Sequence, residues 1–100
     1  MKRVRDHPRV GRELAEARDW YERAEPGLGR QLVLEVDRVL SLIADGRLPT
    51  LPHPTIATVR RVLLKRFPYW LVLLERDDEV VLIAVAHMKR RPDYWLARLH

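Results

Sequence analysis

The sequence predicts an α+β fold in which an N-terminal helix hairpin packs on one face of a small, curved antiparallel sheet of three to four strands. Two observations lead to this prediction. Apolar residues recur at helical spacing in residues 9–44, with a proline–glycine break between two stripes. From residue 58 onward the pattern changes to three segments rich in Val, Ile and Leu, which favour strands. The chain of 100 residues is predicted to form a single domain, residues 1–100.

The first half of the chain predicts the two helices. One apolar stripe lies in residues 9–25 and the other in residues 28–44, and Gly46 stands where a helix C-cap is expected. Because only a short turn at Pro26 and Gly27 separates the stripes, the helices are predicted to run antiparallel. Tyr21, Leu32, Val36 and Ile43 are predicted to be buried against strand residues from 62–86.

The second half predicts the sheet. The segment "RLPTLPHPTIA" holds three prolines and is predicted to be an ordered loop. Strands are predicted at Thr58–Phe67, Tyr69–Arg76 and Glu79–Met88, and their short connections require antiparallel pairing. Residues 2–6 could add an edge strand, but with Val4 as the only aliphatic residue the sequence leaves this open.

Both faces of the predicted sheet are apolar, because "LVLL" and "VVLIAVA" do not alternate between apolar and polar residues. Two helices can cover only one face. The other face must curl onto itself, be covered by the C-terminal segment "YWLARLH", or meet another protein. The sequence leaves these alternatives open.

The composition excludes several kinds of site. There are no cysteines for disulfides or thiolate metal sites, and no apolar run approaches the ~20 residues that span a bilayer. No secretory signal is recognised at the N-terminus, so a cytoplasmic protein is expected. The four histidines (His7, His53, His87 and His100) are far apart in the sequence, and neither a metal nor another cofactor is expected.

The positive charge is concentrated in the second half of the chain. Residues 1–45 carry nine basic and nine acidic residues, whereas residues 46–100 carry ten basic and five acidic residues. No acidic residue occurs between Gly46 and Leu74. This distribution predicts an anionic partner, either nucleic acid or an acidic protein segment.

Three segments, taken in order, resemble a known family: "ARDWYERAEPGLGRQL", "RRVLLKRFPYWLVL" and "VAHMKRRPDYW". The Trp-Tyr pair, the Pro-Gly-Leu-Gly loop, the Arg-Arg…Phe-Pro-Tyr junction and the closing His-x-x-Arg-x-Pro-x-x-Trp are similar to those of the RelE/ParE superfamily of type II toxin–antitoxin toxins, in its ParE-like branch. The resemblance covers residues 8–95.

The resemblance implies a growth-inhibiting toxin, of the kind found in plasmid stabilization systems, that a cognate antitoxin neutralises. ParE-like members inhibit DNA gyrase by binding it, whereas RelE-like members are metal-independent endoribonucleases that cleave ribosome-bound mRNA. The ParE-like activity is the leading interpretation. The endoribonuclease is one alternative, and a non-toxic relic that acts only in a repressor complex is another. The antitoxin is expected to carry an acidic amphipathic segment, and either a homodimer or a toxin–antitoxin hetero-oligomer is compatible with the sequence.

The candidate site residues are mostly basic. Metal-free RNA cleavage needs a base, an acid and cations for the phosphorane charge. If the protein is a nuclease, the catalytic candidates are Arg61, Lys65, His87, Arg90 and Tyr94. Arg60, Arg66, Lys89 and Arg91 are predicted to bind the target or the antitoxin. Alternation along the first strand predicts Arg61 with Lys65 on one face, and Arg60 with Arg66 on the other. For His87 itself, a structural role that caps the strand end and bonds the backbone is favoured over catalysis.

The aromatic residues are predicted to be core rather than ligand-stacking groups. The Trp-Tyr pair is predicted to anchor the hairpin to the sheet, and the last tryptophan to fold the C-terminal segment back over it. The residues concerned are Trp20, Tyr21, Phe67, Tyr69, Trp70 and Trp95.

Overall fold

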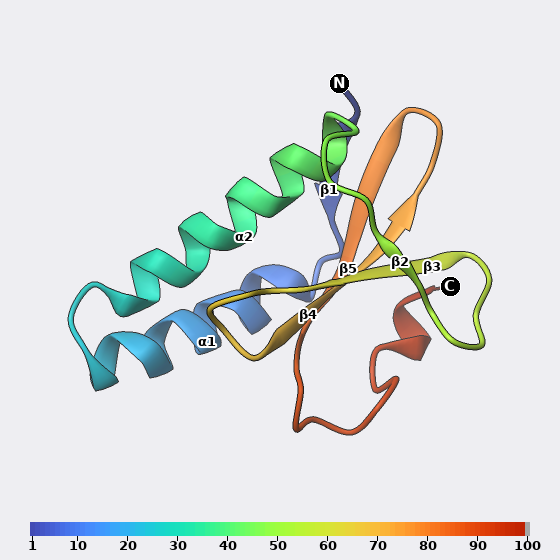
Figure 1. Ribbon diagram of the computed structural model, residues 1–100. Helices are drawn as coiled ribbons and strands as arrows, with labels where there is room; N and C mark the ends of the chain where they lie inside the picture. The colour runs from blue at the N-terminus through green and yellow to red at the C-terminus, as the bar shows by residue number, and fades with distance from the viewer. Residues whose placement is uncertain (100) are drawn as a thin grey trace.

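A computed structural model describes residues 1–99 of the protein. It confirms the α+β fold, with a helix hairpin on one face of a twisted sheet (Figure 1). The elements in chain order are β1 (Arg3–Asp6), α1 (Val10–Ala24), α2 (Leu28–Ala44), β2 (Leu51–Pro52), β3 (Val59–Leu63), β4 (Tyr69–Glu75), β5 (Glu79–His87) and a short 3-10 helix, η1 (Leu96–Leu99). In residues 1–99 no helix combines the length and the apolar character needed to cross a bilayer.

The sheet has five strands, in the order β1-β5-β4-β3-β2, which is more than the three to four predicted. The antiparallel pairing of β3, β4 and β5 is as predicted, but β1 runs parallel to β5, so the sheet is mixed. All four residues of β1 are exposed, and the strand is held by backbone pairing and by the ion pair of Arg5 with Glu79 at 3.2 Å. A strand that buries no side chain leaves no apolar pattern in the sequence.

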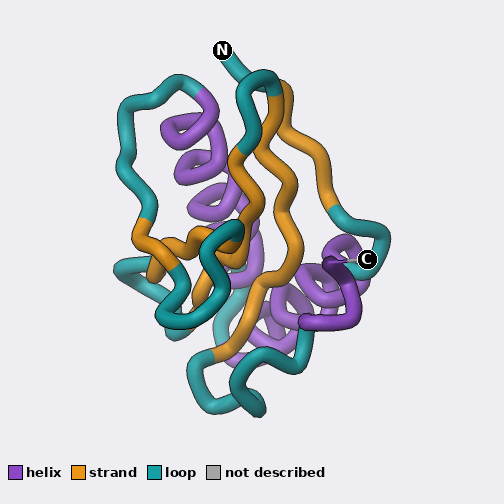
Figure 2. Tube along the Cα trace, turned by 90° about the vertical axis from the view of Figure 1, so that its right-hand side faces the viewer, coloured by secondary structure: helices purple, strands orange, loops and turns teal. Residues whose placement is uncertain are grey.

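The hairpin face of the sheet carries the larger core. Leu32, Val36 and Ile43 of α2 are buried there against strand residues such as Leu71 and Val85, as predicted. Tyr21 is partly buried and packs edge-on against Phe67, with ring centroids 5.2 Å apart. Figure 2 shows this layering from the side, with the strands in front of the hairpin.

The opposite face of the sheet is covered in part by the C-terminal segment. Trp95 is buried in a second cluster with Val59, Val72 and Ile83, and Leu99 packs against it. Of the alternatives for this face, coverage by the C-terminal segment is therefore confirmed where Trp95 and Leu99 pack. Leu63 and Met88 remain exposed on the sheet's surface at 40% and 54%.

Trp20 was predicted to be core, and this prediction is wrong, because 64% of the residue is exposed. The buried side of α1 carries Val10 and Ala17, with Tyr21 packed against the same core. Successive residues of an α-helix are about 100° apart around its axis, so Trp20 lies beside the buried stripe rather than within it. Phe67, Tyr69 and Trp95 are buried, and Trp70 is half-buried.

A carboxylate closes the turn between the two helices. Glu22 accepts hydrogen bonds from the backbone N–H groups of Gly27 at 2.8 Å and Gly29 at 2.9 Å, and the Gly27 bond is the main reason that the pKa of this carboxyl is lowered. Gly27 has a φ of 89°, which glycine adopts without strain. A Cβ at Gly29 would lie 2.2 Å from the carbonyl oxygen of Arg18, so only glycine allows the helices to approach this closely.

Candidate functional site

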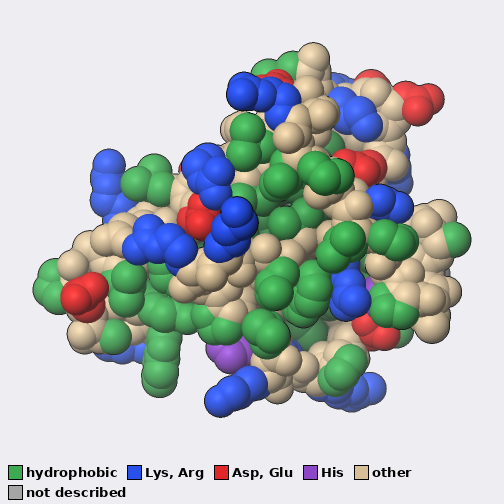
Figure 3. Space-filling view, viewed as in Figure 1, with side chains coloured by type: hydrophobic (Ala, Val, Ile, Leu, Met, Phe, Trp, Pro, Cys, Tyr) green, Lys and Arg blue, Asp and Glu red, His purple; other side chains and the backbone are tan. Residues whose placement is uncertain are grey.

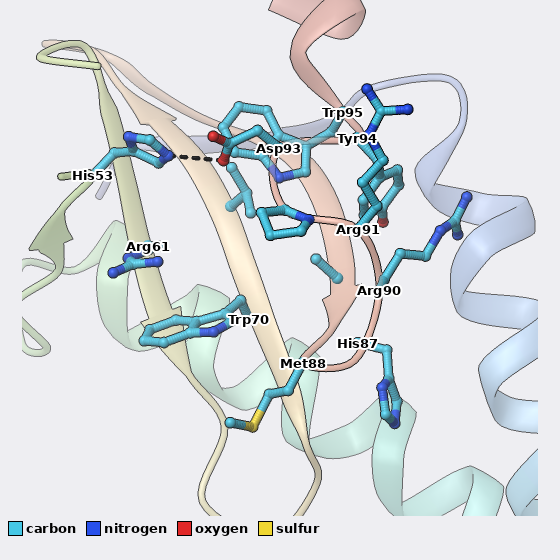
Figure 4. Close-up of a pocket in the computed structure, with 13 residues that line it drawn as sticks. His53, Arg61, Trp70, His87, Met88, Arg90, Arg91, Asp93, Tyr94 and Trp95 are labelled. Atoms are coloured by element: carbon cyan, nitrogen blue, oxygen red, sulfur yellow. Dashed lines mark hydrogen bonds and ion pairs between the residues drawn. The ribbon is translucent and has the colours of Figure 1, made fainter. Parts of the chain in front are cut away.

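A pocket of about 180 Å³ lies on the sheet face opposite the hairpin, where the C-terminal segment turns away from β5 (Figure 4). Arg61 from β3 and Trp70 from β4 form one wall, and residues 87–88 and 90–95 form the other. The pocket combines cationic and apolar side chains, which suits an anionic ligand or partner with some apolar surface.

Arg61 lies flat over Trp70. Its guanidinium carbon is 4.3 Å from the ring centroid, a cation–π contact. The buried Nε atom of Arg61 has no hydrogen-bond partner among the described residues. A buried guanidinium nitrogen without an acceptor is costly, and a carboxylate or phosphate oxygen could reach this one only if the Arg61 side chain moved.

His53 and Asp93 fasten the far side of the pocket. Nδ1 of His53 accepts hydrogen bonds from the backbone N–H groups of Thr55 and Ile56, both at 3.1 Å. The proton must therefore be on Nε2, which donates to the Asp93 carboxylate at 2.9 Å. Asp93 has a φ of 59°, an uncommon backbone conformation that this contact helps to hold. The pair ties the loop before β3 to the C-terminal segment.

Glu13 of α1 joins three parts of the fold. Its carboxylate accepts the backbone N–H of Val85 at 2.8 Å and two guanidinium nitrogens of Arg98 at 3.1 Å. The hydroxyl of Tyr94 also donates to it. Burial, followed by this hydrogen bond, raises the pKa of the Tyr94 phenol. Tyr94 is therefore a protonated donor to Glu13 at neutral pH, rather than a group free to exchange protons with a substrate.

His87 ends β5 with its ring directed away from Arg61 and Trp70 (Figure 4). The ring packs edge-on against Tyr69, with centroids 5.1 Å apart. Its Nδ1 accepts the backbone N–H of Lys89 at 3.0 Å. These contacts are those expected of a histidine that caps the strand end.

The structure brings together only part of the predicted set. Arg61, His87, Arg90, Arg91 and Tyr94 all line the pocket. Arg90 stacks on Tyr94, with its guanidinium carbon 3.9 Å from the ring centroid.

The predicted grouping on the first strand is wrong, because β3 ends at Leu63 and both Lys65 and Arg66 follow it in the turn before β4. Arg66 instead donates to Gln31 of α2 at 2.6 Å. Arg60 is on the opposite face from Arg61, where it donates to the backbone oxygen of Thr50 at 2.6 Å.

The surface carries the mixed character of the pocket. In Figure 3 apolar side chains gather in the middle of the face in view, with Lys and Arg side chains around them. Within residues 1–99, no cluster of three or more His, Cys, Asp or Glu side chains is arranged to hold a metal ion. His100, the fourth histidine, is outside the described residues.

Sequence reasoning missed His53, Asp93 and Glu13. The first two are 40 positions apart, and Glu13 is 81 positions from Tyr94, so no local pattern could pair them. The only signal was composition: Asp93 is the one acidic residue that follows the basic run after β5.

No family model matches the chain, and no curated protein matches it. A chain of the solved structure described as the "Chromosomal ParDE TA system from P. aeruginosa" superposes with a TM-score of 0.75 at 13% identity, covering 89% of this chain and 98% of that one. At this identity the likeness is one of fold, and the protein has the RelE/ParE-like fold that its sequence motifs predict.

Proposed function

We propose that the protein is the toxin of a type II toxin–antitoxin system. The observation that carries this proposal is the likeness in fold to nearly the whole length of a chain from a ParDE system. The ordered Trp-Tyr, Phe-Pro-Tyr and His-x-x-Arg-x-Pro-x-x-Trp motifs support it independently, because they span the helix hairpin, the β3–β4 turn and the C-terminal segment.

We further propose that the toxin acts by binding a protein, DNA gyrase, rather than by cleaving RNA. The target follows from the ParE-like motifs, and the geometry supports the absence of cleavage. Tyr94 is bound to Glu13, the His87 ring turns away from Arg61, and Lys65 lies beyond the strand. An acid, a base and a cation aimed at one phosphate are not assembled in this arrangement.

The alternative is a RelE-like endoribonuclease that acts on ribosome-bound mRNA. One observation favours it: Arg61, Arg90 and Arg91 line one pocket. In this alternative, the guanidinium groups would hold the scissile phosphate, and closure on the ribosome would have to reorient His87.

The neutralising partner is proposed to be an antitoxin with an acidic amphipathic segment. Arg91 lines the pocket and Lys89 lies two residues before it, and both are exposed, so they are suited to steer such a segment during encounter. Charge reversal of both residues should slow association and flatten its salt dependence. Arg90 is a poorer choice for this experiment, because it stacks on Tyr94 and is 3.9 Å from Glu13.

Two assays on the purified protein test the target. Supercoiling by DNA gyrase should be inhibited, and inhibition should weaken with Arg91→Glu. The matched control is Arg3→Glu, because Arg3 is on β1, its side chain is 81% exposed, and it does not line the pocket. Unchanged supercoiling together with cleaved ribosome-bound message would select the endoribonuclease. If induced expression does not slow growth, the toxin proposal is wrong.

A further inference from the structure

The edge of β5 is only partly covered by β1. The parallel pairing joins Arg3–Asp6 to Glu79–Leu82 and stops there. Within the described chain, residues 83–87 of β5 have no strand on this side, and α1 runs beside them instead. Each backbone N–H and C=O on this stretch of edge therefore needs a hydrogen-bond partner other than a strand.

Most of these edge groups already have partners. Arg98 donates to the carbonyl of Ile83 at 3.0 Å, and the N–H of Val85 donates to Glu13 at 2.8 Å. The Val85 bond shows that the N–H and C=O groups of this residue point away from β4. The N–H of Met88, three residues later, donates to the carbonyl of Pro68, on the β4 side, at 2.9 Å. By strand alternation, the Val85 carbonyl and the His87 N–H both face the open edge, and the described residues provide no partner for either.

The free groups allow a short added strand of either direction. An antiparallel strand would use the Val85 carbonyl and the His87 N–H as one widely spaced pair, and pairing beyond these two bonds would need the N–H of Val85 or the carbonyl of His87. Glu13 occupies the first, and the backbone N–H of Arg90 donates to the second at 2.9 Å. A parallel strand would use the same two groups, which stand on either side of Ala86. β1 already pairs with β5 in this direction.

Space and an apolar anchor are present at the same place. A hollow of about 210 Å³ separates this edge from α1, and it is lined by Glu16, Ala17, Trp20, Val85 and His87 among others. Trp20 is 64% exposed beside it. An exposed tryptophan on the rim of a hollow is typical of a protein–protein contact rather than of ordinary surface.

We propose that this edge binds an extended acidic segment of a partner protein, which adds one short strand to β5 beside Ala86 and packs an apolar side chain on Trp20. The charges favour an acidic segment, because Lys89, Arg90 and Arg91 lie directly beyond the strand end. Two carboxylates also line the hollow, Glu13 and Glu16, and Glu13 is already paired with Arg98. The segment is therefore expected to present Asp or Glu beside its apolar residues, at the end that lies next to Lys89–Arg91. The inference rests on the proposed function only for the source of this segment, the antitoxin.

The test is a titration of the ¹⁵N-labelled protein with the blocked peptide acetyl-Glu-Val-Leu-Val-Glu-amide, followed by NMR. Saturable shifts are expected at the His87 amide and at the indole N–H of Trp20. Methylating the peptide nitrogens of the three apolar residues removes the donors for the Val85 carbonyl, and should weaken binding about tenfold or more. Trp20→Ala should weaken binding as well. The matched control is Leu34→Ala on α2, because Leu34 is exposed to a similar degree, 52%, far from this edge.

Three results would overturn the proposal: no saturable binding at millimolar peptide, equal binding of the methylated peptide, or shifts that map to Arg61 and Trp70. A peptide with Lys in place of Glu should bind more weakly. Equal binding would show that the edge does not prefer an acidic segment, and would contradict that part of the proposal. Because the titration contains neither antitoxin nor gyrase, its failure leaves the toxin assignment to the growth and supercoiling assays.

Discussion

Replacing Glu13 with alanine should destabilise the fold more than the loss of any other charged side chain on α1. The Glu13 side chain is 11% exposed and accepts hydrogen bonds from Val85, Tyr94 and Arg98. Its removal leaves the Arg98 guanidinium, also 11% exposed, with the Ile83 carbonyl as its one acceptor among residues 1–99. Breaking a buried ion pair from one side costs about 3–5 kcal/mol. That is a large fraction of the roughly 5–15 kcal/mol that stabilises a domain.

Urea denaturation followed by circular dichroism measures this loss. Glu16→Ala is the matched control, because Glu16 is on the same helix, its side chain is 73% exposed, and its ion pair with Arg12 spans 3.6 Å at the surface. That substitution should change the free energy of unfolding by less than about 0.5 kcal/mol. A loss below about 1 kcal/mol for Glu13→Ala would show that the carboxylate does not hold the C-terminal segment, and would refute the reasoning.

Three further predictions concern stability. Trp20→Ala should cost less than about 1 kcal/mol in urea denaturation, since the indole is 64% exposed; a loss of about 3–5 kcal/mol would return it to the core. Gly29→Ala should lower the unfolding free energy by about 1–3 kcal/mol or more through its clash with a backbone oxygen, whereas Gly11→Ala, with open space around it, should leave it unchanged or raise it by up to about 1 kcal/mol. Stability should fall as the pH rises above about 10, because the raised pKa of Tyr94 and of Tyr69 makes the unfolded chain lose protons first; Tyr94→Phe should flatten this dependence in denaturation at pH 9 to 11, and an unchanged slope would contradict it.

The sequence predicted the parts of the fold that depend on local periodicity. The apolar stripe that begins at Leu28 and the glycine at position 46 predicted a helix over residues 28–44, which are the bounds of α2. Gly46 has a positive φ of 72°, as expected after a helix. The three central strands were also recognised, although β3 ends at Leu63 rather than Phe67. Leu64 and Phe67 are nonetheless buried in the turn, so apolar content alone extended the predicted strand too far.

The features that were missed depend on contacts between distant parts of the chain. β1 buries no side chain, and it pairs with β5 through backbone hydrogen bonds. Residue composition therefore carries no sign of this pairing. Trp20 and Tyr21 are equally aromatic, and only the packing of the hairpin decides which of them faces the sheet. For His87, by contrast, the sequence favoured a structural role at the strand end over catalysis, and its hydrogen bond with Lys89 and contact with Tyr69 agree with that role.

The parallel pairing of β1 with β5 also affects the order in which the protein folds. Arg5 and Glu79 are 74 positions apart, so the first strand has no partner until the last one is made. Helix contacts are local and form early, whereas long-range pairing is slow. From the end of α2 at Ala44 to the end of β5 at His87 the ribosome adds 87 − 44 = 43 residues. At about 5–20 residues per second this takes roughly 2–9 s. During that interval the apolar side of the hairpin has no sheet to cover it, and the nascent chain is then at its most prone to aggregate.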